Sequence, residues 1–313
     1  MPLDPQVKVF LDQMAGWRAS VANLPAPERR AAWKTRPTAV GPAVYKTEDR
    51  LIPGPAGAIP VRIYTPPGTG PFPALVWFHG GGWVIGDIEM ADGTARHLCL
   101  GAECVVISVD YRLAPENKFP AAPEDCFAAT KWAEKNAYLF DIDARRIAVG
   151  GDSAGGNLAA AVSLMARDRG GPSLAFQVLV YPVTERNYTR KSYQENASGY
   201  GLSKEDIVWY WEQYLRADED ANNLYAAPLK ARDLRGLPPA LVITAEYDPL
   251  RDEGAAYAAR LKEAGVPTAY KCYDGVIHGF FGQWAMLDKA KAAVQQACSA
   301  LKAAFAAQMA ARR

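Results

Sequence analysis

The stretch Gly151-Asp-Ser-Ala-Gly-Gly156 carries the strongest signal of fold class in the chain. It directly follows the apolar run Arg146-Ile-Ala-Val149 and opens a helical pattern from Ala154 to Arg167. The spacing G-x-S-x-G between a buried strand and a helix is typical of a nucleophile elbow, a turn so sharp that its serine adopts strained dihedral angles and only glycine fits at the flanking positions. The pattern predicts that Ser153 projects above a sheet, at the positive end of a helix dipole, as a nucleophile.

Around this stretch, from about residue 43 onward, short apolar runs alternate with longer helical patterns, which is typical of βαβ units and a mostly parallel sheet. The predicted buried strands are Ala74–Phe78, Cys104–Val109, Arg146–Val149, Phe176–Val180 and Ala240–Thr244, with Tyr270–Tyr273 as the last strand. Two earlier, more alternating segments, Val44–Leu51 and Ile59–Tyr64, predict an antiparallel hairpin at the edge of the sheet. A C-terminal helix is expected from about Asp288, with Val294, Cys298, Leu301 and Phe305 on one face. The fold class is therefore predicted to be α/β, a central sheet flanked by helices.

Composition excludes several classes of function. Hydrophobic residues make up 50% of the 313-residue chain and charged residues 22%, which is typical of a packed globular protein. The 35 basic and 34 acidic residues give a net charge of +1, so there is no basic field to hold a nucleic acid or an anionic membrane. Length favours one catalytic domain with a small accessory part.

The beginning of the chain and its cysteines predict a cytoplasmic protein without a metal site. The first residues lack a basic segment followed by an apolar run, and no stretch approaches the roughly 20 apolar residues that span a bilayer. Five scattered cysteines without a C-x-x-C pair favour free, buried thiols over a disulfide framework or a zinc site.

Two segments fall outside the alternation of strands and helices: residues 1–40 and 184–222. The second contains Ser203-Lys-Glu-Asp206, which resembles a capping box, followed by the aromatic-rich run Ile207–Trp211 and by Tyr214. A helix with this many aromatic residues must contact apolar groups on more than one side. It therefore either fills a core or lies over a pocket. Insertions between strands of α/β sheets often form binding surfaces, which favours a lid.

A second glycine-rich motif, His79-Gly-Gly-Gly82-Trp83, directly follows the predicted strand Ala74–Phe78. Three consecutive glycines leave backbone N–H groups unshielded, so a loop beside Ser153 could direct two donors at a developing oxyanion. A flexible turn does not require three glycines after a buried strand, and a phosphate-binding loop would need a lysine after them, which is absent. The motif therefore predicts an oxyanion hole.

The general base can be found by elimination, because the chain has three histidines. His79 belongs to the glycine-rich loop, and His97 is expected on a helix as a surface or packing residue. His278 follows the last predicted strand on a glycine-bounded loop, at the carboxyl edge of the sheet where ligands bind in α/β folds. We therefore expect His278 to be the base.

Two aspartates compete for the role of the acid that orients His278. Asp248 follows the predicted strand Ala240–Thr244, and a buried carboxylate there would fix the imidazole tautomer. Asp252 is the alternative, but it is expected to open the next helix, where an acidic residue is favourable for structural reasons. The order Ser153, Asp248, His278 is the one expected of this type of fold.

Taken together, these motifs resemble those of the hormone-sensitive-lipase family of esterases, especially its bacterial carboxylesterase branch. The motifs that carry the resemblance are His79–Gly82, Tyr111-Arg-Leu-Ala-Pro-Glu116, Gly151–Gly155, Asp248-Pro-Leu-Arg-Asp252 and His278-Gly-Phe280. The resemblance implies an α/β-hydrolase fold with a catalytic domain of residues 41–183 and 223–313 and a helical cap of residues 1–40 and 184–222. It also implies that the backbone N–H groups of Gly81, Gly82 and Ala154 form the oxyanion hole.

The same resemblance implies a carboxylesterase that uses a covalent acyl-enzyme, needs no metal or organic cofactor and acts on small ester substrates with short to medium acyl chains. Dimers are common in that family, so a homodimer is an expectation as well. Candidates to line an apolar acyl pocket are Trp83, Trp209, Trp211 and Tyr214, although core packing explains each of them almost as well.

Two rival functions remain open from the sequence. The plant gibberellin receptor resembles the same family but lacks the catalytic histidine, whereas His278 is present here. A serine hydrolase that acts on amides, acetylated sugars or peptides would share the same triad, and only its substrate pocket would distinguish it.

Overall fold

A computed structural model of the chain describes residues 2–36 and 38–310, and its strands form one eight-stranded sheet in the order β1-β2-β4-β3-β5-β6-β7-β8. The strands are β1 (Lys46–Gly54), β2 (Gly57–Thr65), β3 (Phe72–Phe78), β4 (Val105–Val109), β5 (Ile142–Asp152), β6 (Phe176–Val180), β7 (Ala240–Tyr247) and β8 (Thr268–Ile277). The hairpin β1–β2 is antiparallel and joins β4 in antiparallel orientation, while β3 to β8 pair in parallel. The predicted mostly parallel α/β sheet with an antiparallel edge hairpin is thereby confirmed.

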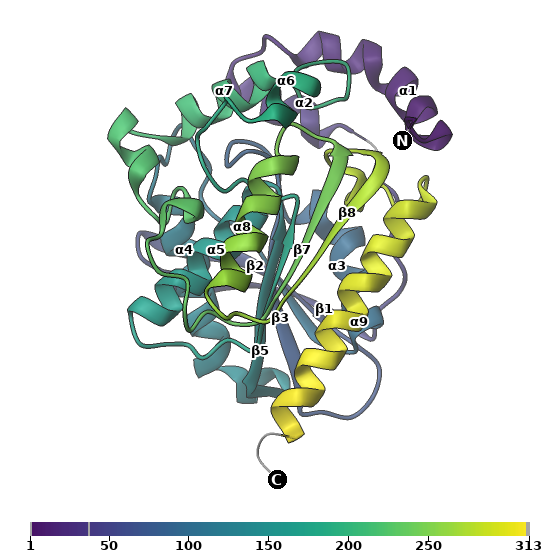
Figure 1. The fold of residues 1–313 in the computed structure, drawn as a ribbon. Coiled ribbons are helices and arrows are strands. Elements are labelled where there is room, and N and C mark those ends of the chain that lie inside the picture. The colour runs from purple at the N-terminus through teal and green to yellow at the C-terminus, as the bar shows by residue number, and fades with distance from the viewer. Residues whose placement is uncertain (1, 37, 311–313) are drawn as a thin grey trace.

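Helices cover both faces of the sheet, with α3 and α9 on one side and α4, α5 and α8 on the other (Figure 1). The helices are α1 (Pro5–Val21), α2 (Ala26–Lys34), α3 (Ile88–Ala102), α4 (Ala121–Lys135), α5 (Ala154–Asp168), α6 (Lys191–Glu195), α7 (Lys204–Tyr214), α8 (Arg251–Glu263) and α9 (Asp288–Ala310). Successive residues of β3 serve opposite faces: Leu75 and Trp77 belong to the core under α3 and α9, whereas Val76 and Phe78 belong to the other core. Because both faces are covered, the central strands are apolar at successive positions.

Several strands are longer than the sequence pattern predicts, and β5 and β8 exceed it by the largest number of residues. β5 begins at Ile142, which pairs with Phe72 of β3, ahead of the predicted start at Arg146. This first part of the strand is charged, and its Asp143 forms ion pairs with Arg145 and Arg146. β8 extends from Thr268 to Ile277 as an edge strand with exposed polar positions. Apolar runs mark only the fully covered part of such strands, so their polar ends are missed.

The two segments outside the alternation lie close together at one end of the molecule, where α1 and α2 lie beside α6 and α7 (Figure 1). Arg29 of α2 forms an ion pair with Asp206 of α7 at 2.5 Å, and Arg18 of α1 donates a hydrogen bond to the carbonyl of Gly201. The helix α7 begins at the predicted capping box, in which Ser203 and Asp206 exchange hydrogen bonds between side chain and backbone.

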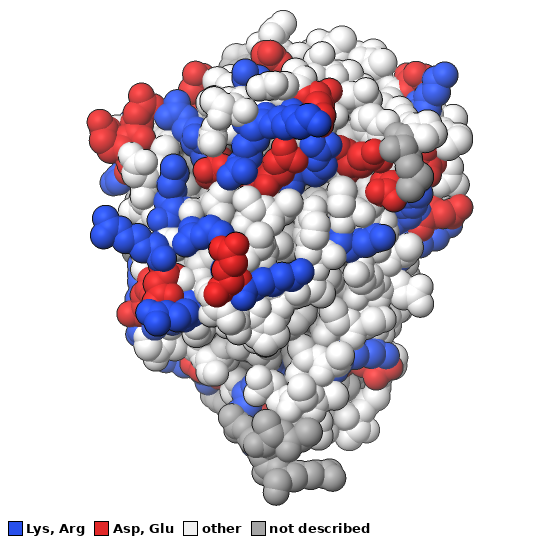
Figure 2. Space-filling view, in the orientation of Figure 1, with Lys and Arg blue, Asp and Glu red and all other residues white. Residues whose placement is uncertain are grey.

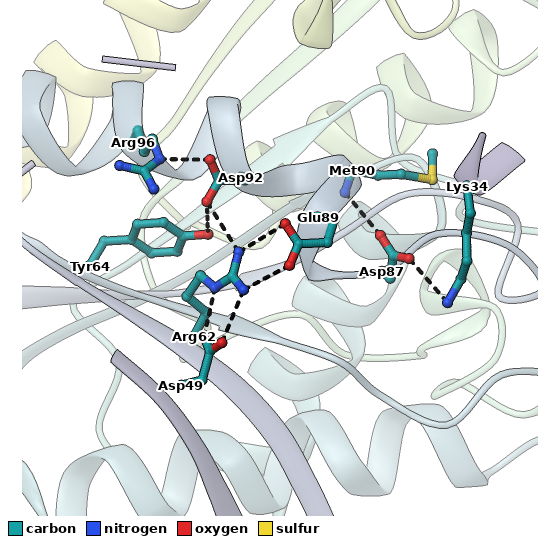
Figure 3. A network of polar contacts seen from close by, with 9 residues as sticks. All are labelled: Lys34, Asp49, Arg62, Tyr64, Asp87, Glu89, Met90, Asp92 and Arg96. Atoms are coloured by element: carbon teal, nitrogen blue, oxygen red, sulfur yellow. Dashed lines mark hydrogen bonds and ion pairs between the residues drawn. The ribbon is translucent and has the colours of Figure 1, made fainter. Parts of the chain in front are cut away.

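A network of ion pairs joins the edge hairpin to α3 (Figure 3). Arg62 of β2 contacts Asp49 of β1 at 2.6 Å and Glu89 of α3 at 2.7 Å, and its side chain is 16% exposed. These two carboxylates raise the pKa of Arg62 above its usual range. Asp92 links the network to Tyr64 and Arg96. The network thus joins β1 and β2 to the first turns of α3.

Three further features of the structure are its surface charge, the character of its helices and the state of its cysteines. On the face drawn in Figure 2, Lys and Arg side chains alternate with Asp and Glu side chains instead of forming an extended field of one sign. Within residues 2–36 and 38–310, no helix combines the length and the apolar character that crossing a membrane requires. All five cysteines are free thiols, four of them buried and Cys272 half-buried.

Candidate active site

Ser153 lies at the turn between β5 and α5, with φ of 57° and ψ of −119°, a conformation that L-residues rarely adopt. The turn is tight because Gly155 approaches β3: a Cβ atom at Gly155 would stand 1.9 Å from the carbonyl oxygen of Phe78. The Ser153 backbone N–H donates to the carbonyl of Val180 at 2.8 Å, which ties the turn to β6. The strained serine is thus held by the strands on both sides of it.

Ser153, His278 and Asp248 form a continuous hydrogen-bonded chain. The Oγ atom of Ser153 lies 2.9 Å from Nε2 of His278, and Nδ1 of His278 lies 2.7 Å from Oδ2 of Asp248. Asp248 is fully buried at the end of β7, and its other oxygen accepts a hydrogen bond from the N–H of Leu250 at 2.9 Å. This geometry can remove a proton from the serine hydroxyl and hold the resulting imidazolium beside a carboxylate.

The competing candidates lie elsewhere. His97 is half-buried on α3 and packs against the ring of Trp284 at 4.3 Å between centroids. His79 is buried and stacks on Tyr111 at 4.4 Å. Asp252 lies in the first turn of α8 and accepts a hydrogen bond from the N–H of Ser192 at 2.8 Å. Among the described residues, none of the three contacts the hydroxyl of Ser153.

The glycine-rich loop after β3 lies beside the serine. The N–H of Gly80 donates to Oδ1 of Asp152 at 3.0 Å, whereas the N–H groups of Gly81 and Gly82 have no hydrogen-bond acceptor among the described residues. Gly81 has φ of 119°, and a Cβ atom there would lie 2.0 Å from the carbonyl oxygen of Ile85. Ala154 is the first residue of α5, where a backbone N–H has no partner within the helix. The three predicted oxyanion donors therefore lie around one serine with their N–H groups free.

Four residues that were not predicted as site residues hold this loop in place: Tyr111, Arg30, Glu116 and Asp152. Tyr111 donates from its hydroxyl to the carbonyl of His79 at 2.7 Å. Arg30 of α2 donates to the carbonyl of Val84 at 2.9 Å and also binds Glu116, so the motif Tyr111–Glu116 supports the loop at both ends. Burial raises the pKa of the Asp152 carboxyl that accepts from Gly80. The motif was visible in the sequence, but its contacts with the loop were not.

A cavity of about 620 Å³ extends from Ser153 and His278 to the segments 1–40 and 184–222. Of the four aromatic candidates, Trp83 and Trp211 are part of its walls, whereas Trp209 and Tyr214 lie outside its lining. Tyr214 is fully buried behind Trp83, against which it stacks at 4.1 Å, and Trp209 packs under the guanidinium of Arg29. Other side chains of the wall are Phe10, Met14, Trp33, Tyr181, Ile207, Tyr210, Leu250, Phe281 and Trp284.

Tyr210 of α7, which was not among the candidates predicted from the sequence, lies against Gly82 of the glycine-rich loop. A Cβ atom at Gly82 would lie 2.2 Å from its ring. Ile207, Tyr210 and Trp211 share one face of α7 because residues three and four apart lie together on a helix. Helical spacing from Ile207 was the signal that could have identified Tyr210.

The loop that carries Asp248 is anchored to the segment 184–222. Ser192 donates from its hydroxyl to the carbonyl of Pro249 at 2.6 Å, and Asn196 donates to the carbonyl of Asp248 at 3.3 Å. The carboxyl of Glu253, buried at the start of α8, accepts from the N–H of Thr184 at 2.6 Å. Burial raises the pKa of Glu253 to about 8.

The described residues contain no group of three or more His, Cys, Asp or Glu side chains that could hold a metal ion. The groups that the described site brings together are the serine hydroxyl, the imidazole, the carboxylate and the backbone N–H groups.

Comparisons with known proteins show which proteins this chain is similar to. A family model described as the α/β-hydrolase fold matches residues 75–282. The chain is 44% identical to the carboxylic ester hydrolase LipN of Mycobacterium tuberculosis, over 84% of this chain and 72% of that protein. It is 43% identical to an arylesterase of Saccharolobus solfataricus, over 90% of this chain and 93% of that protein. A solved structure of an ester hydrolase from the Lake Arreo metagenome, in complex with a bipyridine phosphonate derivative, superposes with a TM-score of 0.93 at 44% identity and covers 97% of this chain and 99% of that one.

Proposed function

Because the chain belongs to the α/β-hydrolase family, in the bacterial carboxylesterase branch related to hormone-sensitive lipase, we propose that it hydrolyses carboxylic esters with Ser153 as its nucleophile. The observation that carries this proposal is the hydrogen-bonded chain from Ser153 through His278 to Asp248, at 2.9 Å and 2.7 Å. In this assignment His278 is the general base, and Asp248 fixes its tautomer and stabilises the imidazolium.

The reaction has two halves. His278 accepts the proton of Ser153 as the hydroxyl oxygen attacks the ester carbonyl, and the tetrahedral intermediate collapses to an acyl-enzyme as the alcohol leaves with that proton. His278 then takes a proton from water, whose oxygen attacks the acyl carbon, and the acid leaves as Ser153 regains its proton. The net reaction consumes one ester and one water and yields one acid and one alcohol.

The N–H groups of Gly81, Gly82 and Ala154 hold the oxyanion in this mechanism. Their lack of other acceptors among the described residues supports the role, because donors that are already aimed and unpaired need no reorganisation in the transition state. The contacts of Tyr111 and Arg30 with the loop keep the glycine donors in position.

Residues 1–40 and 184–222 form a cap in this proposal, and residues 41–183 and 223–313 form the catalytic domain. The common wall that α1, α2 and α7 give to the cavity supports the division. Trp83 and Trp211 border the acyl group, and a cavity of about 620 Å³ fits short to medium acyl chains.

Hydrolysis of a series of p-nitrophenyl esters from acetate to palmitate tests the proposal, using the wild type, Ser153→Ala and His278→Ala. We expect turnover of the short esters by the wild type and a fall to near background in both variants. Retention of the rate by Ser153→Ala would refute the assigned nucleophile. Inactivity of the folded wild type on every ester would favour an amide-hydrolysing or a non-catalytic binding function instead.

A further inference from the structure

Three arginines line the end of the cavity that is formed by the cap: Arg18 of α1, Arg29 of α2 and Arg36, which follows α2. They belong to the same cavity as Ser153 and His278. A pocket for purely apolar acyl chains has no use for three guanidinium groups in its wall, since burying a charge is unfavourable unless it is paired.

The arginines have few negative partners. Asp206 forms an ion pair with Arg29 at 2.5 Å and also acts electrostatically on Arg18. Arg18 and Arg36 form no ion pair with any described carboxylate. Arg36 instead lies over the rings of Trp33 at 5.2 Å, Trp17 at 5.5 Å and Phe10 at 5.9 Å.

The positive charges also act on one another. Burial, together with the neighbouring charge of Arg29, lowers the pKa of Arg18, and burial together with Arg18 lowers the pKa of Arg36. The Nε atoms of Arg18 and Arg29 are buried and have no hydrogen-bond partner among the described residues. An anion placed among these groups would satisfy the unpaired donors and relieve the repulsion.

The remaining acidic group in the cavity wall does not cancel this charge. Asp152 lies next to Ser153, at the catalytic end of the cavity, where its carboxyl accepts a hydrogen bond from the N–H of Gly80 at 3.0 Å. The cap end is connected to the catalytic end through Tyr210, whose ring packs against Gly82 on one side and lies 5.5 Å from the guanidinium of Arg29 on the other.

We propose that the preferred substrates are esters that carry a second, negatively charged group, such as a carboxylate, which Arg18 and Arg36 bind at the cap end while the ester carbonyl lies at Ser153. This inference rests on the proposed ester hydrolysis and adds a substrate class to it. The hydrolysis itself is unchanged, and the anion takes part only by binding.

Matched pairs of esters test the inference. Monomethyl adipate and methyl adipamate differ only in a carboxylate against a carboxamide on the acyl side, and 4-acetoxybenzoate and 4-acetoxybenzamide differ in the same way on the alcohol side. We expect the wild type to prefer the anionic member of at least one pair by about tenfold in kcat/KM, equivalent to about 1.4 kcal/mol, mainly through KM. The pair that shows the preference identifies which part of the ester reaches the arginines.

Variants assign the preference to the arginines. Arg36→Gln should reduce the anionic-to-neutral ratio about tenfold, and Arg36→Lys should keep most of it because the charge remains. Arg216→Gln is the matched control, since Arg216 belongs to the segment 184–222, pairs with Asp220 and is outside the cavity lining. Should Arg36→Gln not fold, the ratio in the wild type should still fall when salt is raised from 50 to 500 mM.

The inference would be overturned if kcat/KM for the anionic ester were no higher than for the neutral ester in both pairs. It would also be overturned if the ratio of the two values were the same in Arg36→Gln as in the wild type. The proposed ester hydrolysis would survive that result if the neutral esters are turned over by the wild type and not by Ser153→Ala. Loss of all four activities in the folded wild type would overturn both.

Discussion

Gly155 of the elbow lies so close to Phe78 of β3 that a Cβ atom on the glycine would stand 1.9 Å from the carbonyl oxygen of the phenylalanine. The carbonyl oxygen belongs to the backbone of β3, and the added Cβ atom would be fixed to the backbone of α5. Neither atom can therefore move aside as the end of a flexible side chain could. We predict that Gly155→Ala destabilises the fold by more than about 4 kcal/mol and abolishes ester hydrolysis. Thermal unfolding and soluble yield measure the change. Gly16→Ala on α1 is the control, since nothing lies within 4 Å of its Cβ position, and it should be neutral or slightly stabilising.

The choice between the two aspartates gives a second prediction. Asp248→Asn should reduce kcat by about a thousandfold or more with the fold intact, because the amide favours the wrong tautomer of His278. Asp252→Asn should keep kcat within about tenfold, because this residue lies at the start of α8 and its partners are the N–H of Ser192 and the side chain of Arg251. Steady-state kinetics on a short ester separate the two. The reverse ranking would assign the acid to Asp252.

Tyr111 is expected to act through the glycine-rich loop. Tyr111→Phe removes the 2.7 Å hydrogen bond to the carbonyl of His79 but leaves the ring stacking, so we expect kcat to fall about tenfold with little change in KM. Tyr138→Phe is the control, because Tyr138 is 77% exposed. Equal kcat values for the two variants would show that the loop does not depend on this bond.

The buried carboxyl of Glu253 should make the stability of the protein depend on pH. Burial raises the pKa of this carboxyl to about 8, so the native state keeps a proton that the unfolded state releases near pH 4.3. The stability that this proton contributes is complete below the unfolded pKa and is lost as the pH rises through the folded pKa, at about 1.4 kcal/mol per pH unit at most.

Glu253→Gln should remove that dependence while retaining an acceptor for the N–H of Thr184. Urea unfolding of both proteins at pH 5.5, 7 and 8.5 measures the free energy of unfolding. The stability of the variant relative to the wild type should increase as the pH rises. If the free energy of unfolding changed with pH in the same way in both proteins, Glu253 would already be ionised at pH 5.5.

The Arg62 network gives a prediction for stability alone. Arg62→Met leaves Asp49 and Glu89 without their shared partner, and we expect a loss of about 2 kcal/mol with kcat unchanged, because the network lies outside the active-site cavity. Arg50→Met is the control: Arg50 is 52% exposed with one partner, Glu48, and should lose less than about 1 kcal/mol. An equal loss in both variants would show that the network adds nothing beyond ordinary surface pairs.

Local patterns predicted the fold well where one short segment contains all the information. The central strands are apolar because both faces of the sheet are covered. The elbow requires glycine at position 155 because the backbone carbonyl of Phe78 is in contact with that residue. The polar ends of β5 and β8 were missed because ion pairs and solvent, rather than apolar packing, surround them.

The segments 1–40 and 184–222 were harder to predict from local patterns. Four aromatic candidates were selected without their directions, and helix phase with tertiary packing decides that Trp211 borders the cavity while Trp209 does not. The motif Tyr111–Glu116 was visible, but its support of the glycine-rich loop depends on contacts with His79 and Arg30, which are distant in sequence.

The sequence by itself determined the sheet, the elbow and the residue types of the site, because strand burial, turn sterics and the order of Ser153, Asp248 and His278 are properties of short segments or of chain order. Only the tertiary structure decided the distances within the site and the charge of the cavity. Arg18 and Arg36 lie in the first 40 residues, and their position in the wall of the Ser153 cavity arises from packing between segments more than 100 residues apart. No local pattern encodes such long-range contacts.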